Sequence, residues 1–170
     1  KRQELGWELH HPIEYQNHIF DQLMEAGKEF GLKPYGIRAM NSLRVEKSYK
    51  LVGTELSIEY SPYESGLDRF VHPNKGDFIG RAALDKWRAK GFSNKLVTME
   101  IHGVTDADVL GNNPIYDNGS VVGRATSGDF GFRLNKSIAL GMVKPELAKV
   151  GQKLKIDILG KMHEASIVEE

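Results

Sequence analysis

The chain has 170 residues, of which 40% are hydrophobic and 27% are charged. These values are ordinary for a globular protein, so the composition argues against a disordered chain and against a membrane protein. Lys plus Arg and Asp plus Glu each number 23, so the chain lacks the basic field of a typical nucleic-acid-binding domain. Cysteine is absent, which excludes disulfides, thiol nucleophiles and thiolate metal sites. We expect a reducing compartment, either the cytoplasm or, in a eukaryote, the mitochondrial matrix.

The first element that we expect is a strand over residues 6–10, in which Trp7 and Leu9 alternate with Glu8 and His10. Alternation in a strand places Glu8 on the face opposite Trp7, where a carboxylate is available for chemistry. This strand has almost no lead-in. We therefore expect the chain to be the ordered part, or one piece, of something longer.

Two helices are expected next. Apolar residues recur at helical spacing over residues 14–30, and Gly31 is typical of a helix C-terminus. A second apolar stripe with the same period covers residues 36–47. It begins just after Pro34, which the first turn of a helix tolerates.

A strand, a turn and a third helix follow. Residues 56–60 alternate between apolar and polar side chains, as in a half-buried strand, and residues 62–66 read as a turn. Asp77 is suited to cap a third helix that ends at Gly91. Residues 1–91 therefore mix helices and strands.

After a short connector, residues 95–170 read as strands alone. Asn118-Gly119 and Gly160-Lys161 are hairpin turn signals, and Asn-Gly is typical of a type I′ turn. Short strands at such spacing indicate a small antiparallel barrel or sandwich, and the whole chain is predicted to be α+β. The expected strands cover residues 96–102, 114–116, 121–126, 138–143, 154–159 and 163–168.

Several of these segments resemble one known family, in the order in which that family carries its signatures. The matching runs are Leu43-Arg44-Val45-Glu46, Gly53, Pro62-x-Glu64-Ser65-Gly66-Leu67, Asp77-Phe78-Ile79-Gly80, Gly119-x-Val121-Val122-Gly123-x-x-Thr126-Ser127-Gly128 and Ile138-Ala139-Leu140-Gly141-x-Val143. They are similar to the aminomethyltransferase family, which includes the T-protein of the glycine cleavage system. Residues 39–47 look most like the folate-binding C-terminal half of dimethylglycine and sarcosine dehydrogenases.

The resemblance implies that the intact protein is a tetrahydrofolate-dependent aminomethyltransferase. It would pass a one-carbon unit from dimethylglycine or sarcosine to tetrahydrofolate and form 5,10-methylenetetrahydrofolate. Residues 1–91 would be the C-terminal part of a folate-binding α+β domain, and residues 95–170 would be the family's C-terminal β-barrel. The implied partners are a small methylated amine and a flavoprotein domain that carries FAD upstream, with no nucleic acid and no membrane. Two alternatives stay open: a folate-dependent demethylase of a methylated sulfonium donor, and a folate-binding module without catalysis.

The resemblance also implies which residues bind the folate. Gly6-Trp7-Glu8-Leu9 matches the family's Gly-x-Glu-Leu motif, whose glutamate grips the pterin ring. A carboxylate suits this ring because the pterin presents an N–H and an amino group side by side, and both carboxylate oxygens accept hydrogen bonds. We name Glu8, Arg44, Tyr63 and Trp7 as the binding candidates.

For three of these candidates a second interpretation stays open. Arg44 could meet the carboxylate tail of a folate, or it could pair with Glu64. Tyr63, like Tyr60, could flank the ring or belong to the core, and Trp7 could simply pack.

We expect neither a catalytic residue nor a metal site in these residues. The aspartate that the family uses in catalysis would lie before residue 1, so this fragment by itself is expected to be inactive. His10 and His11 are neighbours on the expected strand and face opposite ways, which is poor geometry for chelation. Met40 and Leu110 stand where many T-proteins carry arginines, and this argues against a lipoyl-bound or acidic donor.

Overall fold

The structure is a computed structural model that describes residues 6–104 and 106–169. Its internal contacts divide the chain into two compact units, residues 1–36 and residues 37–170. Among the described residues, no helix has both the length and the apolar character that crossing a membrane requires.

The first unit is built on one helix. α1 covers Gln16–Gly27 and is flanked by 3-10 turns at Ile13–Tyr15 and Lys28–Phe30, which confirms the helix expected over residues 14–30. Gly31 ends it with a left-handed φ of 68°. The strand expected over residues 6–10 is wrong, because no described segment pairs with these residues in a ladder. A single extended segment without a neighbour leaves its backbone groups without partners and is not stable as a strand.

The second unit begins with α2, Ile37–Glu46, as the apolar stripe predicted. The strand expected over residues 56–60 is wrong: the segment turns, and its one ladder contact with the described part of the chain is an isolated bridge between Val52 and Leu56. The reason is Glu55, which is fully buried. Its carboxylate accepts hydrogen bonds from the backbone of Leu51 and the hydroxyl of Thr54, and this holds the chain in tight turns rather than extended.

Two 3-10 turns, at Asp68–Phe70 and Pro73–Lys75, lead to α3, which covers Arg81–Lys90 and ends at Gly91 as expected. The prediction that Asp77 caps this helix is wrong. Gly80 occupies the N-cap position with a left-handed φ of 92°, while Asp77 accepts a hydrogen bond from the backbone N–H of Phe78. Asp77 lies too far ahead of the helix for its side chain to cap the first turn.

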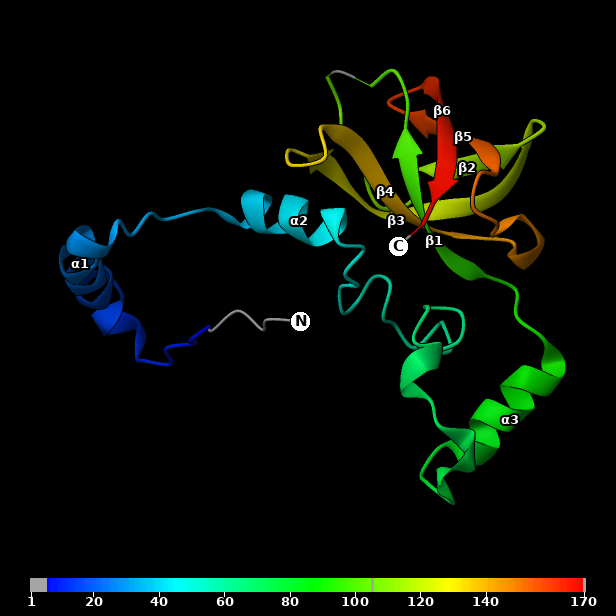
Figure 1. Cartoon of the computed structure of the whole chain (residues 1–170), viewed down its shortest axis with the longest axis horizontal. Helices are drawn as coiled ribbons and strands as arrows, with labels where there is room; N and C mark the ends of the chain where they lie inside the picture. The colour runs from blue at the N-terminus through cyan, green and yellow to red at the C-terminus, as the bar shows by residue number, and fades with distance from the viewer. Residues whose placement is uncertain (1–5, 105, 170) are drawn as a thin grey trace. The chain divides into compact units, whose positions relative to one another are not determined.

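The strands that follow α3 form a closed antiparallel barrel in the order β1-β4-β3-β2-β5-β6, which Figure 1 shows from one side. All six expected strands are present, and the α+β class with a small barrel is confirmed. Asn118 and Gly119, with φ of 47° and 80°, make the first predicted hairpin turn, and Gly160 lies in the second. The strands are β1 Lys95–Ile101, β2 Pro114–Asp117, β3 Ser120–Gly131, β4 Lys136–Val143, β5 Lys153–Ile158 and β6 Lys161–Val168.

The barrel interior is the main hydrophobic core, with Met99, Ile115 and Ile156 fully buried at its centre. β4 is buried on both of its faces, because Leu140 and Met142 form a second cluster outside the barrel, against which Tyr60 packs. The turns between α2 and α3 therefore cover one side of the barrel. This cover brings the polar side chains of residues 48–65 against β3.

Two glycines of β3 lie in close contact with other backbone, that of β4 and that of Val109. A Cβ at Gly123 would lie 2.2 Å from the carbonyl oxygen of Met142, and a Cβ at Gly128 would lie 2.4 Å from that of Val109. Neither position has room for a side chain. Both glycines lie inside β3.

Candidate functional site

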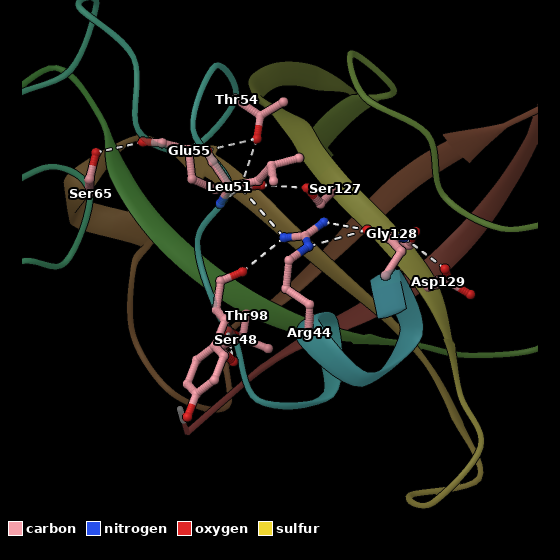
Figure 2. A network of polar contacts seen from close by, with 12 residues as sticks. Arg44, Ser48, Leu51, Thr54, Glu55, Ser65, Thr98, Ser127, Gly128 and Asp129 are labelled. Atoms are coloured by element: carbon pink, nitrogen blue, oxygen red, sulfur yellow. Dashed lines mark hydrogen bonds and ion pairs between the residues drawn. The ribbon is translucent and has the colours of Figure 1, made fainter. Parts of the chain in front are cut away.

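A buried ion pair lies between α2 and the barrel (Figure 2). Arg44 on α2 places Nη1 3.6 Å from Oε2 of Glu55, and the two side chains are 13% and 0% exposed. Arg44 donates a further hydrogen bond of 2.8 Å to the carbonyl oxygen of Tyr49. A charge pair with this little solvent is stable only when its remaining polar atoms are also satisfied.

The Glu55 carboxylate has such partners on both oxygens. Ser127 on β3 donates to Oε1 at 2.6 Å, while the backbone N–H of Leu51 and the hydroxyl of Thr54 donate to Oε2, each at 2.8 Å. Burial by itself would raise the pKa of Glu55. The hydrogen bonds from these groups, together with the nearby hydroxyl of Thr126, outweigh burial and hold the pKa below its ordinary value. The side chain is therefore a carboxylate at neutral pH.

Asn41 extends this network to β3. Its Oδ1 accepts a hydrogen bond of 2.6 Å from Nη2 of Arg44, and its Nδ2 donates one of 2.7 Å to Oδ2 of Asp129. The next residue of α2, Ser42, donates to the carbonyl oxygen of Phe130 at 2.6 Å. The helix is thus held to the barrel through polar side chains.

The predicted pairing of Arg44 with Glu64 is wrong, since the arginine pairs with Glu55. Glu64 is buried and accepts hydrogen bonds of 2.9 Å from the backbone and the hydroxyl of Ser61. The other interpretation, contact of Arg44 with a folate tail, stays a prediction. The guanidinium already has Glu55, Asn41 and Tyr49 as partners, so it would have to give up part of this network.

The other candidates have simpler surroundings. The Glu8 side chain is 91% exposed and lies 3.6 Å from Nε2 of His10, and Trp7 is 83% exposed. Both belong to the first unit, and their role in binding stays a prediction. Tyr63, in the second unit, is half-buried, with its ring 5.6 Å from that of Phe92 and the Arg88 guanidinium 5.6 Å from its centre.

A second arginine lines a polar pocket at the edge of the barrel. This Arg124 pocket has a volume of about 300 Å³, and its wall includes Gly53, Glu59, Asn112 and Thr126. The Arg124 guanidinium donates hydrogen bonds to the Tyr60 hydroxyl at 2.6 Å, to Oδ1 of Asn112 at 3.0 Å and to Oε2 of Glu59 at 2.8 Å. The pocket thus presents a cation in a fixed orientation.

These partners also favour the charged form of Arg124, which an arginine already has at neutral pH. The hydrogen bond to the Tyr60 hydroxyl is the main cause that raises the pKa of Arg124, and the Glu59 carboxylate adds to it. Among the residues that the structure describes, no group of three or more His, Cys, Asp or Glu side chains could hold a metal ion.

Two family models match the chain, one after the other. Residues 3–75 match the GCVT N-terminal domain, and residues 94–170 match the glycine cleavage T-protein C-terminal barrel domain. The chain belongs to the glycine cleavage T-protein family. The resemblance that the sequence motifs carried is therefore confirmed, and the barrel of residues 95–168 is the family's C-terminal barrel.

Relatives of two kinds match almost the whole chain. This chain is 42% identical to the mitochondrial dimethylglycine dehydrogenase of Homo sapiens, with 98% of this chain covered. It is 36% identical to an aminomethyltransferase of Desulfitobacterium hafniense, with 97% of this chain covered. It spans 19% of the first protein and 45% of the second. The crystal structure of aminomethyltransferase T of the Bartonella henselae glycine cleavage system matches with a TM-score of 0.78 and 24% identity, covering 93% of this chain and 44% of that one. That likeness supports the fold.

Two positions at which the resemblance implies an arginine in many T-proteins are accessible in this structure. Met40 is 49% exposed and Leu110 is 58% exposed. A side chain at either position has access to solvent and lies outside the core. Leu110 directly precedes Gly111 and Asn112, which line the Arg124 pocket.

Sequence reasoning missed Glu55, Glu59, Asn112 and Arg124. Glu59 lies in the segment that was predicted to be a strand, and Glu55 directly precedes it. In such a segment a glutamate is normally predicted to face solvent. Asn112 and Arg124 are far from Glu59 in the sequence, and only the pairing of β3 with β2 and the cover of residues 48–65 bring them together. No local spacing signals such a site.

Proposed function

We propose that the full-length protein containing this chain transfers a one-carbon unit from an N-methylated amine to tetrahydrofolate and forms 5,10-methylenetetrahydrofolate. The observation that carries the proposal is the match of nearly the whole chain both to a dimethylglycine dehydrogenase and to aminomethyltransferases. Such a transfer depends mainly on holding the folate nitrogens against an electrophilic carbon in a closed site, which makes the step effectively unimolecular. Carboxylates nearby would stabilise the cationic carbon.

In this proposal, Glu8 orients the folate. Its carboxylate would accept the N–H and the amino group of the pterin with its two oxygens, while Trp7 and Tyr63 stay binding candidates, each within its own unit. The Gly6-Trp7-Glu8-Leu9 motif supports this role and burial does not, since the Glu8 side chain is 91% exposed. The FAD-carrying domain, the intracellular location and the inactivity of residues 1–170 alone stay predictions.

The two accessible replacements favour a dimethylglycine or sarcosine donor over a lipoyl-bound one. Met40 and Leu110 leave fewer positive charges for an acidic carrier, whereas a small methylated amine needs no such surface. A sulfonium donor stays the alternative, since it too is a small methylated cation. To distinguish these donors, each is incubated with tetrahydrofolate and the protein, and the rate at which methylenetetrahydrofolate forms is measured.

Calorimetric titration of the full-length protein with tetrahydrofolate tests the site. We expect Glu8→Gln to weaken binding about tenfold to a hundredfold, because hydrogen bonds to a charged group are worth about 1.5–3 kcal/mol. The neighbouring Glu14→Gln, which removes the same charge outside the motif, should leave the affinity unchanged. Equal affinity of Glu8→Gln and the unchanged protein would refute the assignment of Glu8.

A further inference from the structure

A cavity opens at one end of the barrel. β1 ends at Ile101 and β4 begins at Lys136, so the antiparallel order brings the loop after β1 to the same end as the turn between β3 and β4. The cavity has a volume of about 470 Å³, and the mouth of a β-barrel is a common place for a small-molecule site. The lining of this barrel-mouth cavity comes from that loop, β3 and β4, and consists of Val104, Asp106, Ala107, Asp108, Phe130 and Ser137.

The charge of the barrel-mouth cavity is negative. Asp106 is exposed and Asp108 is half-buried, and neither carboxylate has a hydrogen-bond or ion-pair partner among the described residues. No described residue of the lining is basic. Two unpaired carboxylates on one concave wall reinforce each other's field, so the cavity attracts a cation.

Ser137 is an independent indication of a ligand. The residue is 5% exposed, and its Oγ has no hydrogen-bond partner in the described part of the chain. Ser137 lies opposite Phe130 of β3 and opposite Ile101 of β1, and opposed residues of neighbouring strands share a face. Because Ile101 belongs to the barrel core, the Ser137 side chain points into the end of the barrel, toward the cavity that it lines. Buried polar atoms rarely lack a partner, and a donor from a ligand would satisfy this oxygen.

The rest of the wall is apolar and held in place. Val104 and Ala107 pack against the barrel core. The Phe130 ring packs edge-on against that of Phe132, with the ring centres 5.1 Å apart and the planes at 78°, so its orientation is fixed. An aromatic face of this kind attracts organic cations. A metal ion is a poor match, because calcium and magnesium take about six oxygen ligands or more and the lining offers two carboxylates.

We propose that the barrel-mouth cavity binds a small organic ammonium compound that has an apolar body and no carboxylate. The N–H groups of the ligand would donate to the carboxylates of Asp106 and Asp108 and to the hydroxyl oxygen of Ser137. Its apolar part would contact Phe130 and Val104. A carboxylate on the ligand would be repelled by the two aspartates, so an amino acid such as sarcosine is expected to bind poorly. This inference goes beyond the proposed transfer reaction and does not depend on it.

The test is an NMR titration of the full-length protein with benzylammonium, and with benzyl alcohol as an uncharged probe of the same shape. We expect benzylammonium to bind about tenfold more tightly than benzyl alcohol. Asp106→Asn combined with Asp108→Asn should weaken benzylammonium binding about tenfold and leave benzyl alcohol binding unchanged. The Tm of this double variant should stay unchanged, because neither carboxylate has a partner within the described residues. Asp117→Asn is the matched control, since Asp117 ends β2 at the other end of the barrel.

Ser137→Ala separates a binding role of this residue from a structural one. Removing a buried hydroxyl that has no partner should leave the Tm of the protein without ligand unchanged or raise it. The same substitution should weaken benzylammonium binding about twofold to tenfold, because the ligand loses one hydrogen bond. A purely structural role would change the Tm and leave the affinity as it is.

The proposal is overturned if benzylammonium does not bind, if it binds no better than benzyl alcohol, or if the double aspartate variant keeps the full affinity for it. Binding of calcium chloride that is lost in the double aspartate variant also overturns the proposal, since the cavity would then hold a metal ion. None of these results bears on tetrahydrofolate binding, which the titration with Glu8→Gln tests separately.

Discussion

At the scale of single residues, the decisive feature is that Glu55 is charged and fully buried. Removing one partner of a buried ion pair leaves an uncompensated charge, which typically costs about 3–5 kcal/mol. We therefore expect Arg44→Met to lower the free energy of unfolding of residues 1–170 by about 3 kcal/mol or more in urea. Lys155→Met, which breaks an exposed pair on the barrel, should lower it by less than about 1 kcal/mol. Similar losses in the two variants would show that the Arg44–Glu55 pair carries no special stability.

The same carboxylate predicts a pH dependence with a definite sign. Because the folded protein holds the pKa of Glu55 below its ordinary value of about 4.3, ionised Glu55 contributes stability above that pH. This contribution is lost as the pH falls through the lower pKa of the folded state. Glu55→Gln should therefore be less stable than the unchanged chain at pH 7, and the difference should shrink on acidification below about pH 4.3. Urea unfolding at several pH values measures it, and a constant difference would contradict the prediction.

At the scale of elements, the close contact of β3 with β4 depends on Gly123. A Cβ at this position would lie 2.2 Å from the Met142 carbonyl oxygen and 2.9 Å from Cα of Val143. Backbone atoms cannot move aside as a flexible side chain does, so the strands would have to separate. We expect Gly123→Ala to destabilise the chain by about 1–3 kcal/mol or more. Gly119→Asn is the control, since the turn position has open space and asparagine tolerates its positive φ of 80°. Thermal unfolding of both variants compares them.

The elements also show how far the sequence alone could lead. The barrel strands were predictable because apolar alternation and the Asn118-Gly119 turn are local signals that the barrel satisfies. Residues 56–60 were wrongly predicted to form a strand because their apolar and polar side chains alternate. The burial of Glu55 instead determines the path of this segment. That burial depends on Ser127 and Arg44, which come from other elements, and no local rule places a buried carboxylate there.

At the scale of the whole molecule, buried apolar residues are distributed very unevenly. Those of the barrel core lie between Val97 and Ile167, whereas α1 buries no residue at all and exposes Phe20 and Leu23 to 49% and 47%. A helix of this length has little stability in water without packing, because the cost of starting a helix is high. The chain of residues 1–170 should therefore open locally at α1 long before the barrel unfolds.

Amide hydrogen exchange measures this difference directly. In the chain of residues 1–170, we expect the amides of α1 to exchange with protection close to that of an unfolded peptide, and those of β1 and β4 to exchange only on global unfolding. Repeating the experiment on the full-length protein provides the comparison, since any surface that packs against the apolar side of α1 would slow its exchange. Strong protection of α1 in the chain of residues 1–170 would mean that the helix buries its apolar face within these residues, and the uneven core inferred from the exposures would be wrong.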